Sequence, residues 1–91
     1  MNKKEIIEQI SVNLYISKND VDSVINEFLN TISFCIKNEE TAQITGFGTF
    51  TGKKRGVRII SNPRTGEKIE IPASVVPSFK ASNVLKKFVN M

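Results

Sequence analysis

A turn sequence between two strand-forming flanks constrains the fold more than any other stretch of the chain. Residues 62–66 read Asn-Pro-Arg-Thr-Gly, and each residue type suits its position. Asn62 can bond the backbone that follows it, Pro63 fixes φ at the second turn position, and Gly66 accepts a positive φ. Because both flanks favour strands, we expect a two-stranded arm over residues 53–71 with Pro63-Arg64 at its tip.

Such an arm is not stable by itself. A two-stranded ribbon is marginal in water unless it meets a partner surface or a ligand. The 91 residues suit one domain, 1–91. If the arm projects, only about seventy residues remain for a core, which is close to the lower limit for a domain that folds alone. Dimerisation is the simplest remedy, so we expect a dimer.

Helical spacing dominates residues 1–40, which we assign as a helical part used for dimerisation. Asn2 can cap a first helix that ends near Asn13. Residues 17–20, Ser-Lys-Asn-Asp, form a capping-box pattern for a second helix that continues to about Lys37.

The apolar surface of this second helix is wider than a single stripe, which favours packing on two sides. A second subunit can supply one of them. We assign Phe28, Leu29 and Ile32 to the core or the dimer interface. Cys35, the only cysteine, lies on the apolar surface and is interpreted as a small core hydrophobe without a redox role.

The hydrophobic period changes to two at Thr41, which predicts a hairpin that runs into the arm, within a sheet over residues 41–80. A tight turn around Gly46 and Gly48 can place the Phe47 ring in the core. The Gly-x-Gly sequence does not indicate a nucleotide loop, because no helix follows it. The aromatic residues assigned to the core or dimer interface are Phe47, Phe50 and Phe79.

Prolines and a glycine are expected to interrupt the strands. Pro72 and Pro77 should limit those that follow the tip, which leaves residues 78–80 as a short extended piece. Lys53 and Arg55 fall on one face of an alternating strand, whereas Arg58 falls on the other. Gly56, which lies between them, is interpreted as the site of a bulge that turns the ribbon. Residues 81–91 should form a short C-terminal helix.

Charge is divided unevenly along the chain. Residues 1–40 contain four Lys and seven Asp or Glu, whereas residues 41–91 contain nine Lys or Arg and two Glu. The second half is therefore expected to face a polyanion. A solvated basic surface is the alternative interpretation, since moderate basicity is common.

The composition excludes several kinds of chemistry. The chain has no histidine and a single cysteine, so an internal disulfide, the usual zinc sites and His-based catalysis are unavailable. No pairing of a nucleophile with a base suggests an enzyme, and we expect no metal, cofactor or small-molecule substrate. The N-terminus lacks the apolar region of a signal peptide and no apolar run has the length of a membrane span, so we expect a soluble intracellular protein without a membrane partner.

Four motifs occur in an order and spacing that are specific together: Gly46-Phe47-Gly48-Thr49-Phe50, Asn62-Pro63-Arg64-Thr65-Gly66-Glu67, Ile69-Glu70-Ile71-Pro72-Ala73 and Val76-Pro77-Ser78-Phe79-Lys80. With them, the whole chain resembles the bacterial histone-like HU and integration host factor family, and HU more closely. The resemblance implies an α+β fold that forms an intertwined dimer. Each subunit would have two N-terminal helices, a three-stranded antiparallel sheet with a long protruding β-arm, and a short C-terminal helix.

The resemblance also implies a function. The β-arms of such a dimer embrace double-stranded DNA through the minor groove, Pro63 wedges between base steps, and Arg55, Arg58 and Lys80 match positions that contact the backbone. Such a protein would act in the bacterial nucleoid, in the cytoplasm, as a homodimer or heterodimer. Bent, nicked or four-way DNA would be preferred, because it lowers the energy needed for bending. The full set of candidate DNA-binding residues is Lys3, Lys53, Arg55, Arg58, Asn62, Pro63, Arg64, Lys80 and Lys86.

The chain departs from the family pattern at two places. Residues 58–61, Arg-Ile-Ile-Ser, replace a stretch that is usually basic and contains glycine, and residues 81–83, Ala-Ser-Asn, stand where Pro-Gly-Lys is common. Fewer cations predict weaker and less salt-sensitive DNA binding, although Lys54 and Arg64 can partly compensate. Two alternatives stay open: a DNA bender with a sequence preference, as in integration host factor, and a dimeric protein-interaction module that uses the exposed isoleucines.

Overall fold

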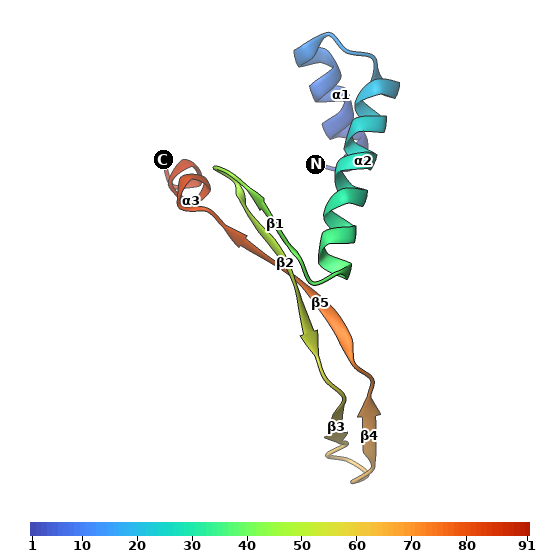
Figure 1. Ribbon diagram of the computed structural model, residues 1–91. Helices are drawn as coiled ribbons and strands as arrows, with labels where there is room; N and C mark the ends of the chain where they lie inside the picture. The colour runs from blue at the N-terminus through green and yellow to red at the C-terminus, as the bar shows by residue number, and fades with distance from the viewer. The chain divides into compact units, whose positions relative to one another are not determined.

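The computed structural model describes the whole chain, residues 1–91. The α+β class expected from the sequence is confirmed, and the residues form two compact units, Met1–Ser33 and Phe34–Met91. Figure 1 labels the elements, which are α1 (Lys3–Leu14), α2 (Lys18–Lys37), β1 (Thr41–Ile44), β2 (Gly48–Arg55), β3 (Arg58–Ser61), β4 (Lys68–Ile71), β5 (Ser74–Ala81) and α3 (Asn83–Val89).

Capping interactions set the ends of the two N-terminal helices. The Asn2 side chain accepts a hydrogen bond from a backbone N–H of the first turn of α1 at 2.9 Å. Helix α1 ends at Leu14, within one residue of the predicted end, where Tyr15 has a left-handed conformation with φ of 56°. The Ser17 hydroxyl accepts a hydrogen bond from the Asp20 N–H at 3.2 Å, so the predicted capping pattern at the start of α2 is confirmed.

The first unit buries little of its apolar surface. Val21 is 4% exposed and is the only buried apolar side chain of the chain. Phe28 and Leu29, on the part of α2 that belongs to this unit, are each 47% exposed. Helix α1 therefore covers only part of the wide apolar surface of α2. No helix of the structure is both long enough and apolar enough to span a membrane.

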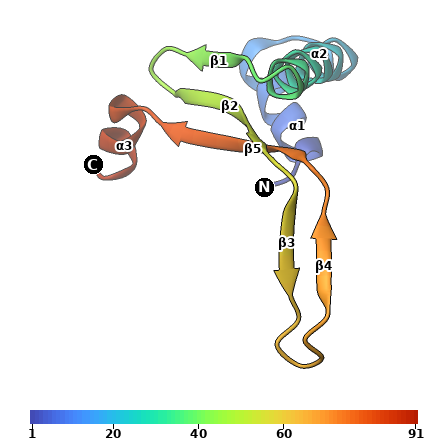
Figure 2. The ribbon, with the colours of Figure 1, turned by 60° about the horizontal axis from the view of Figure 1, so that its bottom comes forward.

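The second unit contains the strands, in two antiparallel sheets. The larger has the order β1-β2-β5, and β3 pairs with β4 in a two-stranded ribbon that Figure 2 shows extending away from the ends of β2 and β5. We call the β2–β5 pair the base and the β3–β4 ribbon with its turn the arm. The turn between β1 and β2 contains Gly46 with φ of 82°, a conformation that favours glycine. The three-stranded sheet and the projecting arm are therefore as the resemblance implied.

The register is continuous from the base into the arm. Arg55 lies opposite Ser74 at the end of the base, and Arg58 lies opposite Ile71 at the start of the arm. The residues that separate these paired positions are 56–57 on one strand and 72–73 on the other, so neither strand has an extra residue. A bulge requires unequal numbers on the two strands, so the interpretation of position 56 as a bulge is wrong.

Pro77 does not limit a strand, contrary to the sequence-based expectation. It lies inside β5, opposite Gly52, and the short piece expected over residues 78–80 is part of this eight-residue strand. Strand β5 is an outer strand of its sheet. One side of an outer strand makes no ladder hydrogen bonds, so a residue without an N–H is tolerated there.

Candidate nucleic-acid interface

The register of the base sorts its side chains into two faces. Residues directly opposite one another in antiparallel strands share a face, and neighbours along a strand alternate. Lys53 and Arg55 of β2 therefore share a face with Lys80 of β5, where no acidic residue occurs. Four hydroxyl side chains and one valine lie among these cations. We call this the cationic face, which consists of Lys53, Arg55, Lys80, Thr49, Thr51, Ser74, Ser78 and Val76.

The opposite face of the base is mainly apolar. The Phe50 and Phe79 rings lie with their centroids 4.8 Å apart, and the Phe47 ring is 5.6 Å from that of Phe79. At Gly48 an added Cβ would meet the Phe79 ring and would lie 2.7 Å from the Lys80 carbonyl oxygen, so this close packing requires glycine. Phe47 and Phe79 are still 46% and 44% exposed, which leaves the ring cluster open on one side.

The arm also has two faces. Arg58 and Ile60 of β3 share a face with Ile69 and Ile71 of β4, and we call this the Ile60 face. The other face, which we call the Ile59 face, consists of Ile59, Ser61, Lys68 and Glu70. Every side chain of the paired positions in the arm is exposed except that of Ile71, which is half-buried.

The turn at the tip of the arm holds Pro63 in an exposed position. The Asn62 N–H donates a hydrogen bond to the Glu67 carbonyl oxygen, and the Asn62 carbonyl oxygen accepts one from the Gly66 N–H, each at 2.8 Å. These two bonds close a loop of residues 63–66. The Asn62 side chain accepts a hydrogen bond from the Arg64 N–H at 2.9 Å, and Gly66 has φ of 74°. The predicted turn chemistry is confirmed. Its effect is to hold the proline ring and the Arg64 side chain outward at the end of the ribbon.

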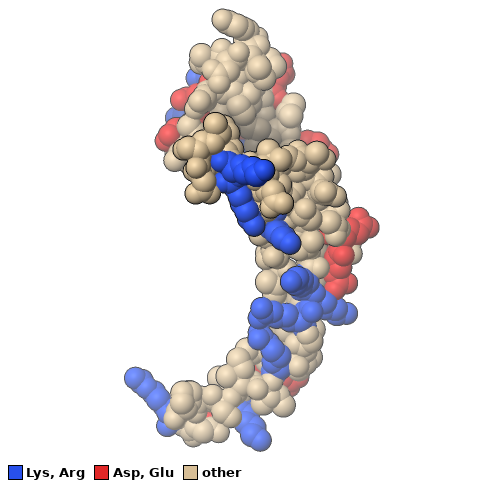
Figure 3. Space-filling model, turned by 90° about the vertical axis from the view of Figure 1, so that its left-hand side faces the viewer, with Lys and Arg blue, Asp and Glu red and all other residues tan.

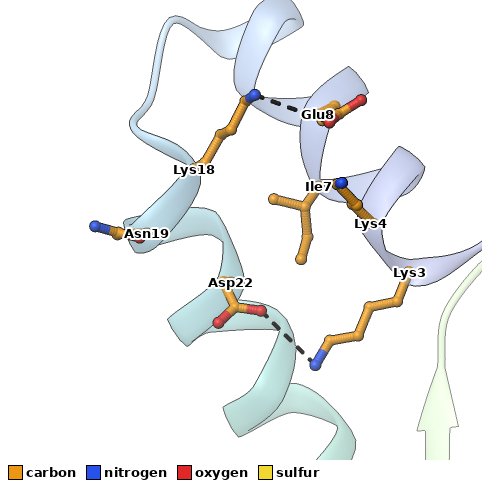
Figure 4. A pocket seen from close by; sticks show the side chains of 7 residues that line it. All are labelled: Lys3, Lys4, Ile7, Glu8, Lys18, Asn19 and Asp22. Atoms are coloured by element: carbon orange, nitrogen blue, oxygen red, sulfur yellow. Dashed lines mark ion pairs between the residues drawn. The ribbon is translucent and has the colours of Figure 1, made fainter.

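Lys3, which we predicted to bind DNA, is engaged inside the first unit. Its Nζ lies 3.7 Å from Asp22 Oδ1 and also donates a hydrogen bond to Asn26. Figure 4 shows this pair at one side of a groove of about 480 Å³ between α1 and α2, where Lys18 and Glu8 form a second ion pair at 3.9 Å. The acids therefore offset part of the positive charge of these lysines.

The remaining predicted cations are distributed along the second unit. Lys86 lies exposed on α3, in its last turn, and Arg58 and Arg64 belong to the arm. Figure 3 shows Lys and Arg side chains spread over this unit from the sheet to the arm, with few acidic side chains between them. The prediction omitted the hydroxyl residues of the cationic face. For Thr49 and Thr51, alternation with Phe50 and Gly52 along β2 is the sequence signal that reveals them.

Comparisons with known proteins agree with this architecture. The family model described as bacterial DNA-binding protein matches residues 1–90. The chain is 42% identical to DNA-binding protein HU 1 of Bacillus subtilis, with 98% of this chain and 97% of that protein covered. It is 39% identical to integration host factor subunit beta of Histophilus somni, with 100% and 98% covered. An Anabaena HU–DNA cocrystal structure has a TM-score of 0.83 and 34% identity, with 98% of this chain and 97% of that one covered.

The chain therefore belongs to the bacterial DNA-binding protein family, which includes HU and the integration host factor subunits. This confirms the resemblance drawn from the four sequence motifs. No group of three or more His, Cys, Asp or Glu side chains is placed to hold a metal ion.

Proposed function

We propose that this chain is an architectural protein that binds double-stranded DNA as a dimer, bends it through the minor groove, and inserts Pro63 between base steps. The observation that carries the proposal is the exposed proline at the tip of a two-stranded arm, joined in continuous register to a base with a cationic face. Membership of the bacterial DNA-binding protein family supports the same function.

The arm is proposed to enter the minor groove of DNA. This groove is about 6 Å wide and presents mostly degenerate base information, so a ribbon that enters it gains affinity with little sequence choice. The Pro63 ring is rigid and apolar, and unstacking one base step with such a wedge costs a few kcal/mol. Contacts from Arg55, Lys53 and Lys80 to the phosphates of the bent duplex offset this energy.

The open apolar surfaces support the dimer. The ring cluster of Phe47, Phe50 and Phe79 is uncovered on one side, and Phe28 and Leu29 of α2 are half-exposed. A second copy of the chain covers such surfaces in the proposed assembly, as in the intertwined dimers of the family. The protein acts stoichiometrically in this role, in the bacterial nucleoid, where it compacts and stabilises DNA.

Binding to deformed DNA tests the bending mechanism. Smoothly bending a site of 20–30 base pairs costs about 1–6 kcal/mol. A nick or a four-way junction lowers this bending free energy, and each 1.4 kcal/mol by which it is lowered raises the affinity about tenfold. We expect the parent protein to bind nicked and four-way DNA at least about tenfold more tightly than linear duplex in gel-shift titrations.

Two variants separate the wedge from the cations. Pro63→Ala should lose most of the preference for nicked DNA and should reduce the bend, measured by energy transfer between dyes at the duplex ends. Arg58→Ala should weaken binding to all three DNA forms by a similar factor, because a phosphate contact does not depend on the kink. Equal affinity of the parent for linear and nicked DNA would exclude bending by insertion.

The same titrations can distinguish two other functions from the proposed one. Much tighter binding to one duplex sequence than to others of the same shape would indicate a sequence-preferring bender, which the similarity to an integration host factor subunit makes worth testing. No binding even at low salt would indicate a protein-interaction module, for which the exposed Ile59, at 69%, is the favouring observation.

A further inference from the structure

The two faces of the arm differ in charge and in apolar surface. On the Ile59 face, Ile59 lies directly opposite Glu70, and Ser61 lies opposite Lys68. On the Ile60 face, Ile60 lies directly opposite Ile69, and Arg58 lies opposite Ile71, with no acidic residue among the four paired positions. The second acid of the arm, Glu67, lies in the turn before β4. Only the Ile60 face therefore combines a cation with a continuous apolar strip.

This apolar strip is exposed without a partner in the chain. Ile60 is 46% exposed and Ile69 is 53% exposed, although they form a cross-strand pair. The other paired side chains of the arm are also exposed, except that of the half-buried Ile71, so no other part of the chain covers the strip. Complete burial of one aliphatic side chain of this size raises an association constant about tenfold or more. A surface that covers the strip would therefore contribute substantially to binding.

We propose that the arm enters the minor groove with the Ile60 face against the DNA, and that Ile60 and Ile69 pack on the deoxyribose walls of the groove. This inference rests on the proposed DNA-binding function and adds the orientation of the arm. The charges favour DNA as the occupant, because Arg58 is the only charged residue of the Ile60 face, whereas on the opposite face Glu70 offsets the charge of Lys68. Apolar contact with the sugars thus replaces part of the affinity that cations would supply.

In the proposed complex, the strip would compensate for the lack of cations in the Ile-Ile-Ser sequence at positions 59–61. Contacts between isoleucine and sugar release no counterions, so their contribution does not change with salt concentration, unlike that of a lysine or arginine. The arm then contributes a part of the binding free energy that persists at high salt. The cationic face of the base contributes the part that salt weakens.

Neighbouring residues on one strand provide a matched test. Ile59→Ser and Ile60→Ser make the same chemical change at adjacent positions on opposite faces of β3. Dissociation constants for nicked duplex are measured from low to high salt for both variants and the parent. Ile60→Ser should weaken binding by about fivefold or more for each arm that contacts DNA, with the salt slope unchanged. Ile59→Ser should stay within about twofold of the parent, since its face makes no apolar contact with the groove.

Lysine variants give a second readout at the same positions. Ile60→Lys should steepen the salt slope by roughly 0.9 for each additional phosphate that it neutralises, and Ile59→Lys should change it less. Thermal unfolding of each variant confirms that the fold is intact. Equal losses for Ile59→Ser and Ile60→Ser, or a larger loss for Ile59→Ser, would overturn the proposed orientation while DNA binding by the parent stands. Failure of the parent to bind at low salt would overturn the proposed function and this inference together.

Discussion

The base and the arm have the same antiparallel register but obtain their order from different sources. In the base, strand β2 pairs with β5 over eight residues and also with β1 on its other side, and phenylalanine rings pack across the apolar face of the base. In the arm, two strands of four residues pair only with each other, and nearly every side chain is exposed. The same backbone geometry is thus fixed by packing in the base and by one ladder and a turn in the arm.

This contrast shows how the two regions divide the work of binding. A rigid base can hold Lys53, Arg55 and Lys80 at fixed spacing, which suits contacts with regularly spaced phosphates. An arm of low local stability can enter a narrow groove and become ordered there, and it loses conformational entropy only when DNA is bound. The difference leads to three predictions, each of which tests it at a different place.

Hydrogen exchange should show the largest difference. We expect the amides of β2 that pair with β5 to exchange only on global unfolding, with opening free energies of several kcal/mol. The amides of β3 and β4 should exchange through local openings whose free energies are close to zero. Addition of nicked duplex should slow exchange in the arm far more than in the base. Exchange of free protein and complex, followed by mass spectrometry or NMR, measures both effects. Equal protection of arm and base in the free protein would remove the contrast.

Two glycines, one in the base and one in the segment that joins the base to the arm, should respond very differently to the same substitution. At Gly52 an added Cβ would meet the Ile36 carbonyl oxygen and would lie 2.9 Å from Val75 Cγ1, whereas at Gly56 nothing lies within 4 Å. Gly52→Ala should therefore reduce the free energy of unfolding by about 1–3 kcal/mol, through overpacking. Gly56→Ala should change it by less than about 0.5 kcal/mol, or raise it slightly, because alanine restricts the unfolded chain. Denaturant titrations of the two variants measure both values, and similar losses at the two sites would contradict the packing described for the base.

Much of this architecture could be predicted from local residue chemistry. Asn2 and Ser17 cap the two N-terminal helices as their sequence patterns indicated, and Asn62 and Gly66 close the turn of the arm. These features depend on contacts between residues a few positions apart, so the sequence contains the information directly.

The errors concern features set by pairing between distant residues. Pro77 was expected to end a strand, but its effect depends on whether β5 is an outer or inner strand. Gly56 was expected to form a bulge, but a bulge is defined by the number of residues on the opposite strand, here 72–73. The grouping of Lys80 with Arg55 depends likewise on the β2–β5 register. None of these is visible from one strand alone.

Adjacent lysines in the base provide the most sensitive test of the cationic face. Lys53 and Lys54 are both exposed, but alternation places Lys53 with Arg55 and Lys80 and places Lys54 with Phe50 on the other face. Lys53→Gln should lower the salt slope of DNA binding by roughly 0.9 for each phosphate that it no longer neutralises. We expect it to weaken affinity by about 1 kcal/mol, the magnitude of a hydrogen bond to a charged group partly exposed to water. Lys54→Gln should have less effect on both quantities, measured by titrations of one duplex at several salt concentrations. If Lys54→Gln reduced the slope as much as Lys53→Gln, the DNA would contact both faces of β2, and the contrast between a cationic face for binding and an apolar face for packing would not hold at the end of the base.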